Sequence, residues 1–155
     1  MSAWLVLAGL VAHAKPPPVV TTCPWSGSPG VEDIDPNSVT IGGVKYKVGG
    51  GKHLLAFVNL LNVCNAGGAT ASLSGWQQAQ NAVATQAAAI TAASISWASK
   101  IAQATTDKEK TALGAEAAAD AAARLVVLKQ LDDAAKVKRE EFMFALLSSS
   151  TAAAE

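Results

Sequence analysis

Few side chains in this sequence have the types and spacing that chemistry requires. The soft metal ligands are two cysteines, Cys23 and Cys64, and two histidines, His13 and His53. Their scattered positions match no zinc-binding spacing. Each histidine also adjoins an apolar segment, where a packed or hydrogen-bonded ring is its ordinary role. The sequence therefore predicts no metal, no cofactor, and no catalytic nucleophile with its base.

Two further motifs resemble functional sites but are incomplete. Gly49-Gly50-Gly51-Lys52 suggests a phosphate-binding loop, but Tyr46 and His53 stand where that loop needs a glycine and a Ser or Thr. The acidic run Glu32-Asp33-Ile34-Asp35 lies in a proline-rich stretch and lacks the regular spacing of a calcium loop. We expect a flexible joint at the first motif and a solvated loop at the second, in a protein that is not an enzyme.

Cys23 and Cys64 are also the candidates for a disulfide bond. In an oxidising compartment, such a bond would stabilise the fold by restricting the unfolded chain. In a reducing cytoplasm the two residues would remain small buried thiols. The sequence does not reveal the compartment, so both alternatives stay open.

Residues 1–18 combine an apolar arm with a proline spacer. Residues 2–14 read SAWLVLAGLVAHA, and Lys15 and three prolines follow. A secretory signal ending at Ala14 is one interpretation, but the run is short and no Lys or Arg precedes it. A helix of this length is too short to span a bilayer. We favour an arm that packs on its own chain or on a neighbouring one.

Residues 19–68 are expected to form a small head. Residues 19–38 are rich in Ser, Gly and Pro and so predict an irregular loop. Two β-branched runs, 39–41 and 44–48, flank a Gly-Gly pair, which predicts a β-hairpin. Residues 53–64 are almost entirely apolar and predict a short buried helix, ended by the glycines that follow.

Charge is distributed very unevenly along the chain. The 47 residues from 53 to 99 contain no Asp, Glu, Lys or Arg, whereas residues 100–141 hold 16 of the 24 charged side chains. A soluble surface normally mixes charges into every helix. A long uncharged helix is therefore expected to be covered by its own chain, by other copies or by a membrane. The balance of 12 basic and 12 acidic residues argues against a nucleic-acid partner.

Residues 69–155 predict a long antiparallel helical hairpin with a frayed tail. Ser74 with Gln77, and Thr106 with Glu109, match capping boxes that predict two helices, from about 74 to 104 and from about 107 to 147. We expect the neutral first helix inside and the charged second helix outside.

A seven-residue repeat in the first helix predicts the surface that packs and assembles. Apolar residues recur at every seventh position from Trp76, and a second row, mostly small or polar, lies four residues further on each time. Small residues let a partner helix approach closely. The expected interface comprises Trp76, Val83, Ala87, Ile90, Ser94, Trp97 and Ile101 of the first helix, and Leu128 and Leu131 of the second.

The predicted fold is therefore mainly α with a small β-hairpin, in which a small N-terminal head carries a long antiparallel helical hairpin. Alanine, with 33 residues, buries little area, so such a hairpin covers only part of its own surface. We expect a non-enzymatic structural subunit that forms a homo-oligomer or packs with other subunits of a large assembly, for instance a bacteriophage virion. The composition of residues 66–130 resembles that of the small ejection proteins of short-tailed bacteriophages, although no motif carries this likeness.

Two alternative functions remain at this stage. One is an exported or periplasmic helical binding module with one disulfide, which would place the protein outside the cytoplasm. The other is a pore-forming or membrane-associated protein. Membrane contact is disfavoured because the Ser, Thr, Gln and Asn side chains of residues 79–99 are unfavourable against lipid.

Overall fold

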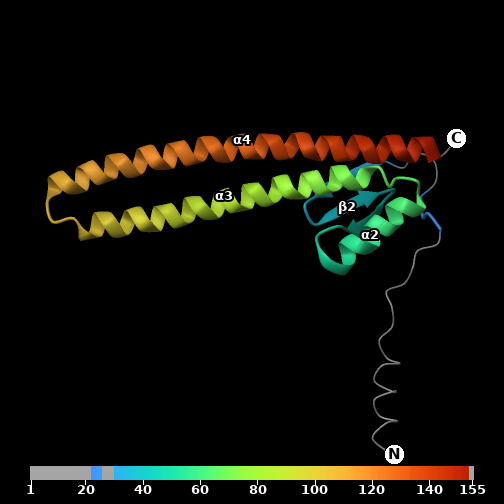
Figure 1. The fold of residues 1–155 in the computed structure, drawn as a ribbon, viewed down its shortest axis with the longest axis horizontal. Coiled ribbons are helices and arrows are strands. Elements are labelled where there is room, and N and C mark those ends of the chain that lie inside the picture. Colours follow the sequence, from blue (N-terminus) through green and yellow to red (C-terminus); the bar gives the residue numbers. More distant parts are fainter. Residues whose placement is uncertain (1–21, 26–29, 154–155) are drawn as a thin grey trace, which may run out of the picture.

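The computed structural model describes residues 22–25 and 30–153 (Figure 1). The expected N-terminal arm, with its alternative as a secretory signal, lies outside these residues, as does His13. The fold is mainly helical, with a small head at one end of a long antiparallel hairpin. Its elements are β1 (Val31–Asp35), β2 (Ser38–Ile41), β3 (Val44–Lys47), α2 (Gly51–Val63), α3 (Ala69–Gln103) and α4 (Asp107–Ala153).

The head contains a three-stranded antiparallel sheet in the order β1-β2-β3. The predicted hairpin is confirmed as β2 and β3, because Ile41 pairs with Val44 across Gly42 and Gly43. These glycines have φ values of 57° and 79°. A type I′ turn requires positive φ at both central residues, which glycine adopts without strain.

Strand β1 corrects the predicted loop over residues 19–38. Its sequence, VEDID, contains three acidic residues, a type that is depleted in strands. A register shift between Val31 and Asp33 also breaks the alternation of apolar and polar residues. Ile34 is nevertheless buried, so β1 contributes to the core.

The acidic run therefore lies in a strand and its turn, which replaces the expected solvated loop. Asp35 accepts hydrogen bonds from the backbone N–H groups of Asn37, at 2.8 Å, and Ser38, at 2.9 Å. The Ser38 hydroxyl donates to the same carboxylate at 2.7 Å and is the main cause that lowers the Asp35 pKa, followed by the Asn37 N–H. This carboxylate thus closes the turn between β1 and β2.

Helix α2 ends one residue earlier than predicted, and its last turn holds one half of a disulfide. Asn65, with a φ of 57°, takes the left-handed position expected of a glycine. The Ala66 N–H donates to the Leu61 carbonyl at 2.6 Å, which closes the final turn. Cys64 directly follows the last residue of α2 and forms a disulfide bond with Cys23, with the Cα atoms 4.9 Å apart. Of the two alternatives for the cysteines, the structure contains the disulfide.

The almost wholly apolar sequence of α2 suggested a helix buried on all sides, but α2 is buried on one face only. Phe57, Leu60 and Leu61 are buried against the sheet and α3, whereas Leu55 is 69% exposed. The Tyr46 ring bridges the sheet and this helix, since its centroid lies 5.9 Å from that of Trp25 and 6.1 Å from that of Phe57. The core of the head thus depends on aromatic contacts.

The head and the base of the hairpin share a single core (Figure 1). Trp76 of α3 and Phe142 of α4 are both fully buried, and their rings stack with centroids 5.9 Å apart. Polar contacts reinforce the junction. Gln77 donates to the Val48 carbonyl at 2.8 Å, and Arg139 donates to the Ile34 carbonyl at 3.3 Å. The C-terminal part of α4, through Arg139 and Phe142, therefore packs the base of the hairpin against the head.

Of the two predicted capping boxes, the one at α4 is present and the one at α3 is not. Helix α3 begins at Ala69, so the predicted start at Ser74 is wrong. The Ala69 N–H is satisfied by the Ala66 carbonyl at 3.0 Å, and the helix has no side-chain cap. The box at α4 is confirmed, because the Glu109 N–H donates to the Thr106 hydroxyl at 3.1 Å. The Glu109 carboxylate returns to the Thr105 N–H, one residue earlier than in the standard box.

Helix α4 continues through the tail that was predicted to fray, as far as Ala153.

Replacement of both cysteines by serine should destabilise the head by about 4 kcal/mol, the loop-closure value for a bridge that spans 41 residues. Urea unfolding followed by tryptophan fluorescence measures this loss, and reductant should have the same effect on the unmodified protein. An unchanged unfolding midpoint in both experiments would show that the head does not depend on the bond.

Candidate functional site

The predicted seven-residue row of α3 lies against α4. Trp76 is fully buried at the base, and Val83, Ile90 and Trp97 are partly buried along the hairpin. The row continues to Ala104 at the tip, which is also partly buried. On α4 this seam is met by the partly buried Leu128 and Leu131 and the buried Ala135.

The second predicted row divides between the seam and the surface. Ile101 is partly buried, but Ala87 and Ser94 are exposed in the single chain. The positions three residues after the first row, rather than four, provide the other side of the seam. These are Ala79, Gln86 and Ala93, all partly buried.

The lack of charge in α3 suggested that this helix lies inside the molecule, and the structure contradicts that expectation. Among residues 22–25 and 30–153, the part of α3 beyond the head contacts only α4, and its other sides are exposed (Figure 1). We define the neutral face as the exposed, uncharged side of the hairpin beyond the head. It comprises Ala84, Ala87, Ala88, Thr91, Ser94, Ile95, Ala98 and Ala102 of α3, with Ala118, Ala121 and Leu125 of α4.

A groove of about 430 Å³ runs between the two helices at this face. Ser94, Ala98 and Ile101 line it from α3, and Ala118 and Ala121 line it from α4. Two large apolar side chains stand close by in sequence, since Ile95 follows Ser94, and Leu125 lies one helical turn after Ala121. Ile95 is 67% exposed and Leu125 is 54% exposed.

Trp97, Asp120 and Arg124, which also line this groove, belong to a polar cluster between the two helices. The Trp97 indole N–H donates to the Asp120 carboxylate at 2.9 Å, and the Arg124 guanidinium donates to the same oxygen at 2.9 Å. The ammonium group of Lys100 lies 4.6 Å from the centre of the Trp97 ring. The Gln86 amide donates to the Arg124 carbonyl at 3.1 Å. This cluster was not predicted from the sequence, although the four-residue spacing of Asp120 and Arg124 is a signal for such a pair.

The cluster lowers the pKa of Asp120 below its ordinary value of 3.8. The hydrogen bond from Trp97 is the largest cause, and the hydrogen bond from Arg124 is the second. Both donors favour the ionised carboxylate because it accepts hydrogen bonds better than the neutral acid. The cluster thus links the two helices through the hydrogen bonds from Trp97 to Asp120 and from Gln86 to the Arg124 carbonyl.

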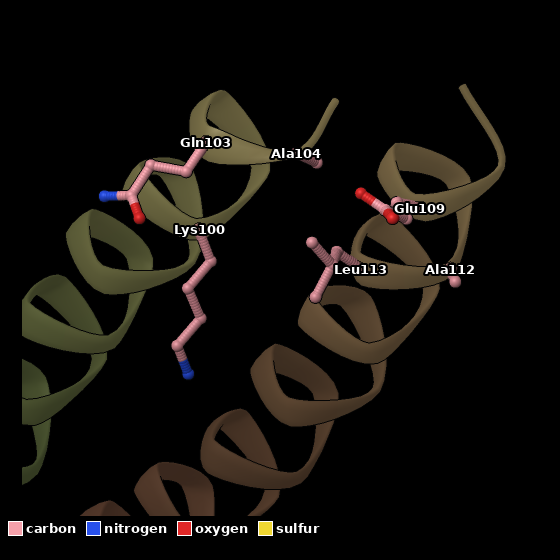
Figure 2. Close-up of a pocket in the computed structure, with 6 residues that line it drawn as sticks. All are labelled: Lys100, Gln103, Ala104, Glu109, Ala112 and Leu113. Atoms are coloured by element: carbon pink, nitrogen blue, oxygen red, sulfur yellow. The ribbon is translucent and has the colours of Figure 1, made fainter. Parts of the chain in front are cut away.

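A second hollow, of about 440 Å³, lies at the tip of the hairpin (Figure 2). Figure 2 shows Lys100, Glu109 and Leu113 reaching into the space between the two helix ends, while Gln103 points away from it. The Glu109 carboxylate already accepts from the Thr105 N–H at 3.2 Å. The tip is therefore a capped turn that carries charge, in contrast to the neutral face beside it.

The remaining candidate ligands stay apart. His53 is exposed in the first turn of α2, and both cysteines are used in the disulfide. In residues 22–25 and 30–153, no three His, Cys, Asp or Glu side chains lie together in a way that would hold a metal ion. No helix in the described part of the chain has the length and hydropathy needed to cross a bilayer.

Comparison of the chain with protein-family models, with curated proteins and with solved structures finds no match in any of the three. Its candidate site is therefore defined by its own geometry, the neutral face and its groove.

The lowered pKa of Asp120 predicts an acid-sensitive hairpin. The contribution of a carboxylate with a lowered folded-state pKa is complete above its ordinary value of 3.8 and is lost as pH falls through the lowered value. Thermal unfolding below pH 4 should therefore show a loss of stability that is smaller in the Asp120→Asn variant, because of Asp35 and Asp120, whose pKa values are both lowered, that variant keeps only Asp35. Trp97→Phe keeps an aromatic ring but removes the indole N–H along with the five-membered ring, so it should raise the Asp120 pKa in a carboxyl NMR titration. An unchanged Asp120 pKa in that variant would contradict the assignment.

Proposed function

We propose that this protein is a non-enzymatic structural subunit that packs into a larger complex through the neutral face of its hairpin. The observation that carries the proposal is that α3 has a single charged residue, Lys100, and yet is largely exposed beyond the head. An exposed surface without charge is unusual in a protein that remains a monomer.

The composition of the neutral face supports a contact with protein. The cores of protein interfaces are depleted in charged residues. The face offers alanines for close approach, together with the exposed Ile95 and Leu125 as apolar anchors. The charged groups in the groove, Asp120 and Arg124, neutralise each other at 2.9 Å, so a partner need not supply a counter-charge.

Nearer the head, α4 carries charge. Ion pairs within the helix join Lys129 to Asp133 at 3.1 Å and Lys136 to Asp132 at 3.3 Å. Asp132 lies seven residues after Leu125, so these pairs border the neutral face on the side of the head. Exposed pairs of this kind add little stability but keep a surface hydrated, so the neutral face is bounded by charge along α4.

The disulfide favours a second candidate function, an exported binding module. Disulfides persist mainly in oxidising compartments outside the cytoplasm, and Cys23 and Cys64 are bonded here. In this alternative, the neutral face binds a helix of a different protein, and the purified chain is a monomer. The native mass separates the two candidates, and the mass of the mature chain reveals whether residues 1–14 are removed during export.

The first test is the native mass of the full chain by light scattering in plain buffer. A discrete multiple of 15.7 kDa is expected for the structural subunit. Ala87→Glu should reduce that mass to the monomer, because a buried unpaired carboxylate in an interface costs several kcal/mol. Ala87 is exposed, so the variant should keep the helical content of the parent in circular dichroism.

The matched control is Ala119→Glu, which makes the same change at an exposed position of α4 seven residues before the exposed Val126, outside the neutral face. It should still associate through the neutral face, so its native mass should stay above that of the monomer. Normal assembly of Ala87→Glu would show that the neutral face is not the contact surface. A monomeric parent would favour the binding module.

A further inference from the structure

The exposed residues of α3 include a second seven-residue repeat, distinct from the row that faces α4. Its positions alternate in steps of four and three, the spacing of a coiled-coil seam. Its members are Ala84, Ala88, Thr91, Ile95, Ala98 and Ala102, and all six are exposed. Ala98 also lines the groove, so this repeat and the groove belong to the same side of the hairpin.

Among the six side chains of this outer repeat, the only polar group is the Thr91 hydroxyl. The Thr91 hydroxyl donates to the Ala87 carbonyl at 3.3 Å, so it is satisfied within its own helix. The other members are alanines and one isoleucine. Such a seam fits a second uncharged helix at close distance, whereas a charged partner would lose its hydration without compensation.

The neutral face has both a projection and a groove. Ile95 of α3 is 67% exposed, and the groove of about 430 Å³ beside it is lined by small residues together with larger ones that include Trp97, Asp120 and Arg124. When two copies meet through the same face, the projecting side chain of each can enter the groove of the other. A two-fold pair uses the same surface patch on both partners, so one surface that has both a projection and a groove is sufficient.

The head determines the direction of the pairing. Gln80 and Asn81 of α3 line a pocket together with Asn37, Gly49 and Leu54, so the head covers this side of the hairpin base. Two copies aligned in parallel would bring their heads to the same end, where they would collide. Antiparallel copies place the heads at opposite ends, and the free stretch from Ala84 to Ala104 is then centred near Ser94.

The area is adequate for a stable pair. The free stretch is about 30 Å long at 1.5 Å per residue, and two adjacent helices are about 20 Å wide. The face therefore offers roughly 600 Å² per copy, or roughly 1,200 Å² in total, at the lower end of the range for specific interfaces.

We propose that the occupant of the neutral face is the same face of a second copy, paired in antiparallel about a two-fold axis near Ser94 to form a four-helix bundle with a head at each end. This inference rests on the assembly function proposed above and adds the partner and its arrangement.

Single cysteines in the full chain test this arrangement, because the native cysteines are already bonded to each other. A two-fold axis brings the two copies of a residue together only near the axis. Ser94→Cys should therefore oxidise to a species of twice the 15.7 kDa chain mass on a non-reducing gel. Ala84→Cys lies on the same face but about 15 Å from the axis, since ten residues separate it from Ser94. It should cross-link at least tenfold less, as should Ala119→Cys outside the face.

The outcomes separate the two proposals. An oligomeric native mass with cross-linking at Ser94→Cys alone would support both. An oligomeric mass with equal cross-linking at Ala84→Cys would indicate parallel pairing, and preferential cross-linking at Ala119→Cys would indicate another face. Either result would overturn this inference while the subunit proposal stands. A monomeric mass over the full concentration range would overturn both.

Discussion

The stack of Trp76 on Phe142 fixes one end of this molecule, and the remaining elements depend on it. The two rings join the start of α3 to the end of α4 inside the core of the head, and the Cys23–Cys64 bond ties that core to the chain that precedes the sheet. The indole N–H of Trp76 is buried and has no hydrogen-bond acceptor in the described part of the chain, so packing supplies the stability here. Beyond this core each helix can bury only one side against the other. The stability of the hairpin should therefore decline from its base to its tip, where fewer apolar contacts are buried.

The many alanines in the middle of the hairpin favour regular helices but bury little apolar area between them. The helix propensity of alanine keeps α3 and α4 regular over long distances, but each side chain buries little area. Polar contacts compensate along the seam, as in the hydrogen bond of Trp97 to Asp120 and that of Gln86 to the Arg124 carbonyl. The same shortage of buried area leaves the neutral face exposed in a single chain. A surface of this kind gains most from a partner that is equally small and uncharged.

The sequence predicted those features that short segments of chain determine alone. The Gly42-Gly43 turn and the cap at Thr106 depend on nearby residues, and the structure confirms both. Strand β1 depends on its pairing with β2, so its acidic sequence resembled a loop. The start of α3 was misplaced because the Ala66 carbonyl, and not Ser74, satisfies its first N–H group. The seven-residue repeat correctly identified one row of α3 that packs on α4. The second row depends on which side of the first row α4 lies, and that is set by tertiary packing. Because α4 lies on the other side from the one predicted, Ala87 and Ser94 are exposed.

A two-fold pair would use the neutral face of both copies completely, so any larger assembly needs a different surface. The side of α4 that faces away from its seam with α3 carries exposed apolar residues for such a contact, since Val126 is 57%, Val137 53% and Phe144 74% exposed. Their spacings of eleven and seven residues correspond to about three and two helical turns, which places them along one side of the helix. Ion pairs flank this row, as between Lys138 and Glu141 at 3.1 Å. These charges are already paired within α4, so a contact there would depend on burial of the apolar row, as would the uncharged pair through α3.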